Sequence, residues 1–212
     1  MTALLLAIDS ATEACSVALF EDGRLLAGDH RMLGRGHAEQ LVPMISALPG
    51  RGRATTIAVA LGPGSFTGLR VGLAAARALA FAWGADLVGY PTLDLVSAMA
   101  RDRQPGPVAV AMTGGHGEWF VQRFDAEGLP LSSAESLAPA QAVAACGEML
   151  VAGSQAEALV AARRTGTAMP LWPDARAVPL LRAGVLTATV RPLYGRAPDA
   201  TLPAGPIAAA RP

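Results

Sequence analysis

The sequence predicts an α/β protein of two lobes, each built on a mixed sheet that begins with an antiparallel hairpin. The first observation is a set of short apolar runs that open the chain, over residues 4–11, 14–21 and 23–30. Turn-length segments separate these runs, and Asp22-Gly23 favours a hairpin because both residues tolerate positive φ. The second is an alternation of strand and helix patterns after residue 36. The third is another hairpin pattern around the turn at 113–117.

The first lobe continues with three helices and two strands. Leu41, Met44, Ile45 and Leu48 recur at spacings of three and four, which predicts an amphipathic helix over 37–48 that Pro43 bends. The remaining elements are strands over 55–61 and 85–90, a long Ala-rich helix over 69–83 and a short helix over 93–100. The stretch Arg101–Pro107 is polar, Pro-rich and without periodicity, so we place the boundary between the lobes there.

The second lobe repeats the order of hairpin, helix and strand. Its predicted elements are strands over 108–112, 118–124 and 148–153 and helices over 139–146, 154–164 and 175–188, with Ser154 as a helix N-cap. The predicted lobes are residues 1–100 and 101–196, and a Pro/Ala-rich tail without a packing pattern covers 197–212. Two lobes of this kind match the actin-like and sugar-kinase-like architecture, the ASKHA fold.

Composition excludes several classes of protein. The 212 residues are 52% hydrophobic, and 17 basic side chains balance 17 acidic ones, so no global field draws the chain to nucleic acid or to an anionic membrane. Cys15 and Cys146 have neither the spacing of a metal site nor a favoured disulfide. The first residues lack a basic region, and the longest low-charge stretch carries Arg77 and Asp86. We therefore expect a soluble, cytoplasmic protein without a membrane partner.

Three long motifs carry a family resemblance. They are "AIDSATEACSVAL" at 7–19, "GHAEQLVPMI" at 36–45 and "GPGSFTGLRVGLAAARALA" at 62–80, with weaker support from 115–124 and 192–200. On these motifs the chain resembles the TsaB (YeaZ) family, also called glycoprotease-like or M22-like. That family serves the synthesis of threonylcarbamoyladenosine (t6A) on tRNA. The resemblance runs from about residue 4 to 196.

The resemblance implies a scaffold role. It implies pairing with the catalytic subunit TsaD through the first lobe, a TsaE-type ATPase partner, a homodimer when TsaD is absent, and contact with tRNA only through the complex. It implies no intrinsic cofactor and leaves open ATP or ADP at the interface with TsaD. The alternatives are an ATP-dependent small-molecule kinase of the same fold and an M22-like peptidase.

Two turns are candidates for phosphate binding. Asp9, Ser10 and Thr12 stand where an actin-like ATPase carries an acidic, Gly-containing phosphate turn, but no glycine lies between Asp9 and Cys15. They are therefore a weak, degenerate candidate for a cofactor site. In the second turn, Thr113 and Gly115 replace the Asp and Arg that the resemblance leads us to expect.

We predict no catalytic residue and no metal ligand. The resemblance to TsaD implies two histidines four residues apart, and Thr92 and Val96 occupy those positions, with Asp94 between them. His37-Ala38-Glu39 lacks the second histidine of a zincin, because residue 41 is Leu. "GPGSFTG" is not a nucleophile elbow.

The Gly-rich stretch Leu61–Gly72 is the remaining question. It lacks the lysine of a Walker loop and carries Phe66 at its tip, whereas Thr67 suits the N-cap of a helix that begins at Gly68. Small apolar residues continue around this helix, which indicates burial on more than one side. We therefore predict a partner interface, and the sequence leaves open which face of the helix forms it. The predicted interface residues are Phe66, Gly68, Leu69, Arg70, Gly72, Leu73, Ala76 and Arg77.

Overall fold

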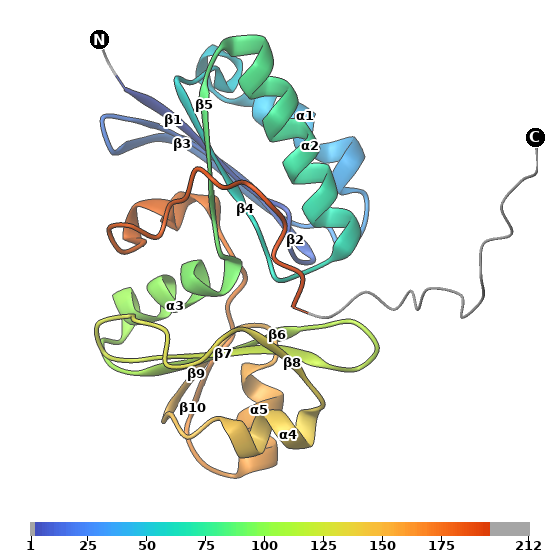
Figure 1. Ribbon diagram of the computed structural model, residues 1–212, viewed down its shortest axis with the longest axis vertical. Helices are drawn as coiled ribbons and strands as arrows, with labels where there is room; N and C mark the ends of the chain where they lie inside the picture. The colour runs from blue at the N-terminus through green and yellow to red at the C-terminus, as the bar shows by residue number, and fades with distance from the viewer. Residues whose placement is uncertain (1–2, 196–212) are drawn as a thin grey trace, which may run out of the picture.

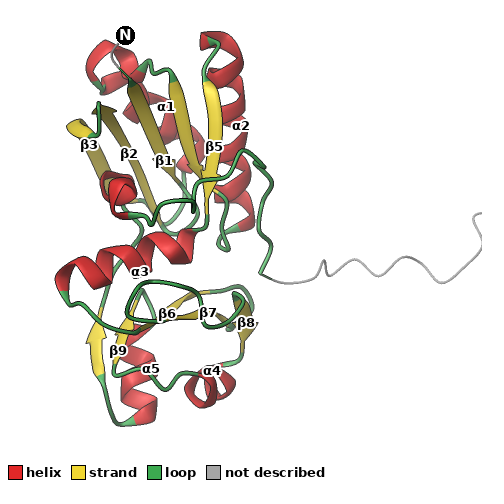
Figure 2. Cartoon of the chain, turned by 60° about the vertical axis from the view of Figure 1, so that its left-hand side comes forward, coloured by secondary structure: helices red, strands yellow, loops and turns green. Residues whose placement is uncertain are grey.

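The computed structural model describes residues 3–195 and consists of stacked layers of helix and sheet (Figure 1). Two five-stranded sheets lie one above the other. Helices α1 (His37–Ala47) and α2 (Phe66–Trp83) cover the outer face of the first sheet. Helices α4 (Pro139–Ala145) and α5 (Ala156–Arg163) cover the outer face of the second. Helix α3 (Thr92–Arg103) lies between the sheets, as Figure 2 also shows.

The first sheet has the order β3-β2-β1-β4-β5. Its strands are β1 (Leu4–Asp9), β2 (Ala14–Glu21), β3 (Arg24–Met32), β4 (Thr56–Ala60) and β5 (Asp86–Tyr90). The first three are antiparallel, whereas β4 and β5 run parallel to β1. Asp22 and Gly23 adopt positive φ in the β2–β3 turn, as the hairpin signal predicts. The sheet is therefore mixed, with the hairpin at its start.

The second sheet repeats this topology with the order β10-β9-β6-β7-β8. Its strands are β6 (Val108–Thr113), β7 (Trp119–Phe124), β8 (Glu135–Leu137), β9 (Leu150–Ala152) and β10 (Thr167–Met169). Strands β6 to β8 are antiparallel and β9 and β10 are parallel to β6, so each strand has a counterpart in the first sheet. This repeat confirms the predicted two-lobed α/β fold.

One hydrophobic core joins the two lobes. It gathers buried residues from both sheets and from α3, including Phe20, Tyr90, Leu93, Val110 and Phe124. Two further clusters lie outside it, one beneath α1 and α2 and one beneath α4 and α5. Because α3 contributes side chains to the shared core, the lobes meet through packing rather than through a bare linker.

The predicted final helix is wrong. Residues 175–188 form only a short 3-10 helix, η2 (Ala175–Leu180), because Pro179 lacks an amide proton and Gly184 adopts positive φ. The chain from 171 to 195, here called the return segment, packs against the first sheet instead (orange to red in Figure 1). Thr187 pairs with Gly89, and the Leu193 amide donates to the carbonyl of Leu61.

Other boundaries differ locally. Helix α3 continues through Arg103 into the predicted linker, and strands β8 and β10 were not predicted. The Ser154 side chain does not cap α5, since its Oγ accepts from the amide of Thr113 at 2.9 Å. The lobe boundaries stay a prediction, although the return segment joins the first lobe by packing. The predicted tail, 197–212, lies outside the described residues.

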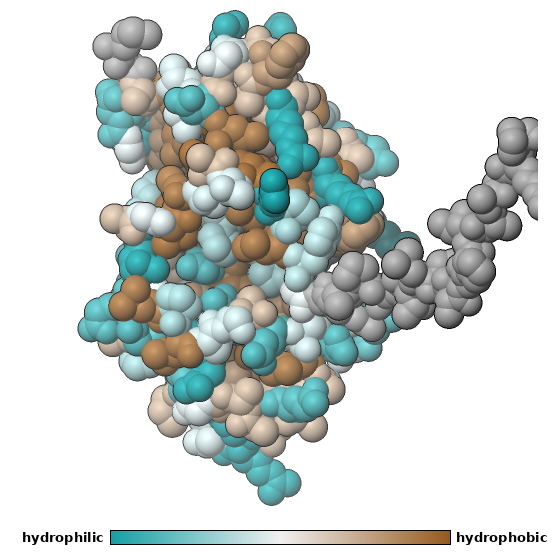
Figure 3. All heavy atoms as spheres, in the orientation of Figure 1, coloured by the Kyte–Doolittle hydropathy of each residue, from teal (hydrophilic) through white to brown (hydrophobic). Residues whose placement is uncertain are grey.

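Two further findings concern the surface and the cysteines. Cys15 and Cys146 are buried and unbridged. Among residues 3–195, no helix is both long and apolar enough to cross a membrane. On the face drawn in Figure 3, hydrophilic and apolar side chains are interspersed over both lobes.

Candidate functional site: an interlobe cavity beside a closed turn

Asp9 ends β1 and is completely buried. Its Oδ1 accepts from the amide of Ala11 at 3.0 Å, and its Oδ2 lies 3.3 Å from the hydroxyl of Tyr90. Burial raises the pKa of Asp9 to about 7, with a further rise from the charge of Asp174 that the two hydrogen bonds oppose. The carboxyl group thus lies in the core.

The turn that follows Asp9 is closed by the Gly-rich loop. Ser10 is 2% exposed and its Oγ donates to the carbonyl of Gly68 at 2.9 Å. A Cβ on Gly64 would lie 2.0 Å from the Ala11 carbonyl oxygen, and one on Gly68 would lie 2.1 Å from that of Ser10. Such contact is available only to glycine. The glycines of this loop therefore serve close packing on the turn.

Two of the three predicted cofactor residues, Asp9 and Ser10, are buried under the start of α2. Their contact with a cofactor stays a prediction. Thr12 is 6% exposed, and its Oγ1 accepts from the amide of Ala14 at 3.2 Å. Thr12 nevertheless lines a cavity. His37 Nε2 lies 2.8 Å from the Thr12 carbonyl oxygen, so this histidine holds the turn rather than a metal.

The second-lobe turn is held by hydroxyl and amide groups. Thr113 Oγ1 lies 3.0 Å from Ser154 Oγ and accepts from Gln155 Nε2 at 2.9 Å. The Gly114 amide donates to the carbonyl of Glu118, which closes the β6–β7 turn. Thr113 thus takes a structural role at the position where the resemblance implies an Asp.

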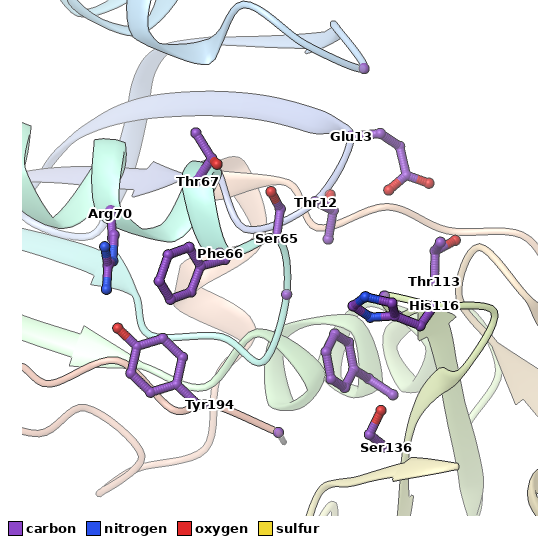
Figure 4. Close-up of a pocket in the computed structure, with 16 residues that line it drawn as sticks. Thr12, Glu13, Ser65, Phe66, Thr67, Arg70, Thr113, His116, Ser136 and Tyr194 are labelled. Atoms are coloured by element: carbon purple, nitrogen blue, oxygen red, sulfur yellow. The ribbon is translucent and has the colours of Figure 1, made fainter. Parts of the chain in front are cut away.

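A cavity of about 900 Å³ opens between the two turns (Figure 4). Its walls come from both lobes and from the end of the return segment. Arg70, Phe66 and Tyr194 gather at one end, whereas Glu13 and His116 lie toward the other. The lining residues are Thr12, Glu13, Gly34, Gly64, Ser65, Phe66, Thr67, Arg70, Thr113, Gly114, Gly115, His116, Phe120, Ser136, Tyr194 and Gly195. A volume of this size suits a small organic molecule.

Several cavity residues were not predicted. Tyr194, Phe120 and Ser136 come from segments far apart in the chain, and no spacing pattern links them to the first turn. Tyr194 belongs to "PLYGRAPDA", which carried only weak family support. Tertiary packing alone brings these residues together.

The TsaD-like metal positions lie at the start of α3. Thr92 and Val96 are fully buried, and Thr92 Oγ1 has no hydrogen-bond partner within the described residues. Burial raises the pKa of Asp94 to about 6, against the opposing charge of Arg182. Between residues 3 and 195, no group of three His, Cys, Asp or Glu side chains is placed to hold a metal ion.

The predicted interface on α2 divides into two sets. Leu69, Leu73 and Ala76 are at most 3% exposed and pack on the first sheet, and the backbones of Gly68 and Gly72 approach Ser10. These five residues serve internal packing in this structure, and their contact with a partner stays a prediction. Phe66, Arg70 and Arg77 remain exposed. Their contact with a partner stays a prediction.

The capping prediction at the start of α2 also changes. The helix begins at Phe66, and Ser65 is its N-cap, with Oγ accepting from the amide of Gly68 at 3.3 Å. Thr67 lies within the first turn. Ser65 precedes the first helical residue, so its carbonyl already accepts from Leu69.

The duplicated sheets and the turn at the start of each define a two-lobed, actin-like protein. The ethanolamine utilization protein EutJ from Carboxydothermus hydrogenoformans shares the fold, with a TM-score of 0.50 and 12% identity over 84% of this chain and 90% of that one. YeaZ from Pseudomonas aeruginosa is more similar, with a TM-score of 0.74 and 26% identity over 91% of this chain and 99% of that one.

A family model described as TsaD, tRNA N6-adenosine threonylcarbamoyltransferase, matches residues 31–202. The chain belongs to this TsaD-related family, and its relatives include proteins of the TsaB (YeaZ) type and proteins named tRNA N6-adenosine threonylcarbamoyltransferase, such as that of Solidesulfovibrio magneticus, which is 35% identical over 53% of this chain and 37% of that protein. The tRNA threonylcarbamoyladenosine biosynthesis protein TsaB of Escherichia coli (strain K12) is 37% identical over 134 residues, 59% of this chain and 57% of that protein. TsaB of Haemophilus influenzae is 42% identical over 46% of this chain and 42% of that protein. The chain thus spans about half the length of these relatives.

Proposed function

We propose that the chain is a non-catalytic subunit of the cytoplasmic machinery that makes t6A on tRNA. Its family membership carries the proposal, because the relatives of TsaB type bear the name of this pathway. In the proposed complex it pairs with TsaD, meets tRNA only through that complex, and works with a TsaE-type ATPase. ATP or ADP would bind at the interface with TsaD rather than at the closed turn of this chain.

The non-catalytic role is supported by the groups present at the two turns. Asp9 is buried beneath α2, Thr113 is bonded to Ser154, and Glu13, whose carboxylate lines the cavity, accepts from Trp172 Nε1. At the start of α3, neither Thr92 nor Val96 offers an imidazole. The same observations weigh against the kinase and peptidase alternatives.

The outer faces of α1 and α2 form the surface that we assign to pairing. The two helices lie side by side (Figure 1). Phe81 is 93% exposed and Val42 is 51% exposed, and the exposed Ala74 and Ala78 continue the apolar face along α2. Exposed large apolar side chains beside small ones suit close packing of a partner helix. The same surface would support a homodimer in the absence of TsaD.

Charge insertion on this surface tests the proposal. Ala74→Glu should leave the fold intact yet abolish co-purification with TsaD of the same organism and homodimer formation, because the carboxylate would lie in a desolvated interface. Leu73→Glu should instead unfold the chain, since Leu73 is 3% exposed. Light scattering after size exclusion and thermal melts measure the two effects.

Ala158→Glu is the matched control, because Ala158 is exposed on α5 in the second lobe. This variant should pair as the unchanged chain does. Retained pairing in a folded Ala74→Glu variant would show that α2 is not the interface. ATP turnover by the purified chain, near one per second as in an ordinary enzyme, would contradict the non-catalytic role.

A further inference from the structure

The first sheet has one covered edge and one open edge. On the β5 side, Gly89 and Thr187 exchange backbone hydrogen bonds of 2.8 and 3.0 Å, so the return segment covers that edge. On the other side, β3 pairs with β2 alone. Figure 2 shows β3 at the margin of the sheet. An uncovered edge strand is a template on which a further strand can pair.

Strand β3 lacks most of the features that block pairing at an edge. It is nine residues long, and none of them is buried. It contains no proline, and its single register shift lies near the hairpin turn, opposite Phe20. The stretch 27–32 is therefore regular and long enough to accept another strand.

The backbone groups of alternate β3 residues point away from β2. The Leu33 amide donates to the carbonyl of Glu13 at 2.9 Å, in the register that β2 and β3 share. Hydrogen-bonded and non-hydrogen-bonded pairs alternate in an antiparallel ladder, so every second residue before Leu33 bonds to β2 and the residues between face outward. The outward residues are Gly28, His30 and Met32. Within residues 3–195, no hydrogen bond joins their outward groups to another element.

The charges on β3 select one register for two antiparallel copies of the strand. Only registers that place outward residues opposite each other can form hydrogen bonds. Centred on Asp29 or on Arg31, such a register places like charges directly opposite each other, which is destabilising. Centred on Gly28, it leaves both charges without an opposite charge across the pair. Centred on His30, it places Asp29 of each copy opposite Arg31 of the other.

The two charged side chains are already ordered for this contact. Arg31 Nε donates to Asp29 Oδ2 at 2.8 Å, and Arg31 Nη1 donates to Gln40 Oε1 at 3.2 Å. Both charged residues thus lie on the face of the sheet that α1 covers. In the register centred on His30 they form non-hydrogen-bonded pairs, in which opposite side chains are closest.

The other face of β3 offers an exposed apolar side chain and a space for it. Met32 is 53% exposed, and in this register it lies opposite Gly28 of the second copy. Gly28 has no side chain, and the stem of Arg176 lies over it, since a Cβ there would be 2.6 Å from Arg176 Cγ. Met32 would therefore pack beside that stem and lose its exposure to water.

We propose that β3 pairs antiparallel with β3 of a second copy of this chain, centred on His30, so that one sheet runs through both copies. This surface is the edge of the sheet, whereas Ala74 and Phe81 of the surface assigned to pairing lie on α2. The two contacts are therefore separate. A chain that used both would join more than two copies.

Disulfide cross-linking of the full chain tests the register. In the proposed pair the two His30 Cα atoms lie about 5.5 Å apart, which a disulfide can span. The two Arg24 Cα atoms lie about 40 Å apart along the strands. Under oxidation by copper phenanthroline, His30→Cys should therefore form linked dimers at least about tenfold faster than Arg24→Cys. Cys15 and Cys146 are buried in both variants.

Charge variants test the ion pairs without an added cysteine. Asp29→Arg and Arg31→Asp each place like charges opposite each other in a self-pair, so each should self-associate more weakly than the unchanged chain. A mixture of the two variants regains both opposite-charge pairs. Capture of one variant by the tagged other should therefore exceed the self-capture of either by severalfold. The ion pair within the chain is lost in both variants, so its loss cannot produce this recovery.

Arg53→Asp is the matched control partner for Asp29→Arg. Arg53 is exposed and lies outside β3, and the variant has the same net charge as Arg31→Asp. All chains in the mixtures also carry Ala74→Glu, which removes the pairing assigned to α2. The result is a difference between mixtures, so it stays readable if α2 is not the interface.

Thermal melts would verify that each variant is folded. The proposal is overturned if His30→Cys and Arg24→Cys form linked dimers at equal rates. It is also overturned if Asp29→Arg captures Arg31→Asp no better than it captures Arg53→Asp.

Discussion

At the scale of single residues, Asp9 stands where the sequence suggests the acidic residue of a phosphate turn, but in the structure its carboxyl group is buried in the core. The Tyr90 hydroxyl has one proton but lies 3.0 Å from the Ile8 carbonyl oxygen and 3.3 Å from Asp9 Oδ2. The single Tyr90 proton can go to only one of these two acceptors at a time. If Asp9 is protonated, it can donate to Tyr90 Oη while Tyr90 donates to Ile8, so both contacts are hydrogen bonds. Burial and this arrangement therefore favour the neutral acid below about pH 7.

The first prediction concerns the pH dependence of folding. The pKa of Asp9 is about 7 in the folded chain against an ordinary value of 3.8, so folding takes up a proton between these two pH values. The contribution of Asp9 to the free energy of unfolding is therefore largest below about pH 4. It decreases as the pH rises toward 7 and stays constant at higher pH. Asp9→Asn, which keeps a donor toward Tyr90, should lose this decline. Between pH 4 and pH 8, the free energy of unfolding of the variant should rise by a few kcal/mol relative to that of the unchanged chain. The size follows from about 1.4 kcal/mol per unit of pKa shift.

Urea unfolding of both chains at several pH values measures the difference. Asp94 titrates in both chains, so its own contribution cancels in the comparison. An equal difference in unfolding free energy at pH 5 and at pH 8 would refute the neutral-acid assignment.

At the scale of elements, α2 is positioned by its glycines. Gly64, Gly68 and Gly72 face the β1–β2 turn, and a Cβ on Gly72 would lie 2.4 Å from Ser10 Oγ. The helix thus begins against the turn between the end of β1 and the start of β2, and Ser65 caps it there. The spacing of Gly64, Gly68 and Gly72 is explained by contact within the chain, whereas Ala74 and Ala78 are exposed on the outer side of the helix.

The second prediction reverses an ordinary helix rule. Gly→Ala inside an exposed helix usually stabilises by up to about 1 kcal/mol. Gly68→Ala should instead destabilise the chain by several kcal/mol, because its Cβ would lie 2.1 Å from a backbone oxygen. Gly115→Ala is the control, since nothing lies within 4 Å of its Cβ position. A melting temperature of Gly68→Ala at or above that of the unchanged chain would contradict the close-packing explanation.

At the scale of the whole molecule, the return segment ties the lobes together. Leu171, Ala175 and Val178 are buried in the core that both sheets share. Trp172 donates to Glu13, and Arg77 Nη2 donates to the Val190 carbonyl at 2.8 Å. A segment that follows the second sheet in sequence is therefore part of the first lobe's packing.

The third prediction separates this segment from the tail. Removing residues 197–212 should change the melting temperature by less than about 5 °C, roughly 1 to 2 kcal/mol for a chain of this size. Removing 171–212 should prevent folding, because it opens the shared core. Circular dichroism melts of both truncated chains measure this. A larger fall after tail removal alone would show that the tail docks on the described part of the chain.

The sequence by itself determined the class of fold and most of its elements, because hydrophobic periodicity and turn residues act locally. Asp22-Gly23 specified its hairpin, the apolar spacing around Leu41 specified α1, and the long motifs specified the family. The sequence also indicated that the Gly-rich loop is no phosphate cradle of Walker type.

Only the tertiary structure decided which side of each element meets which neighbour. The burial of Leu73 and the exposure of Ala74 follow from how α2 lies on its sheet. Because this helix is apolar nearly all round, the spacing of its apolar residues does not indicate which face is buried. The cavity depends on contacts between residues as distant in the chain as Glu13 and Tyr194. The closure of the Asp9 turn depends on a backbone approach between β1 and α2, and such a long-range contact leaves no periodic trace in the sequence.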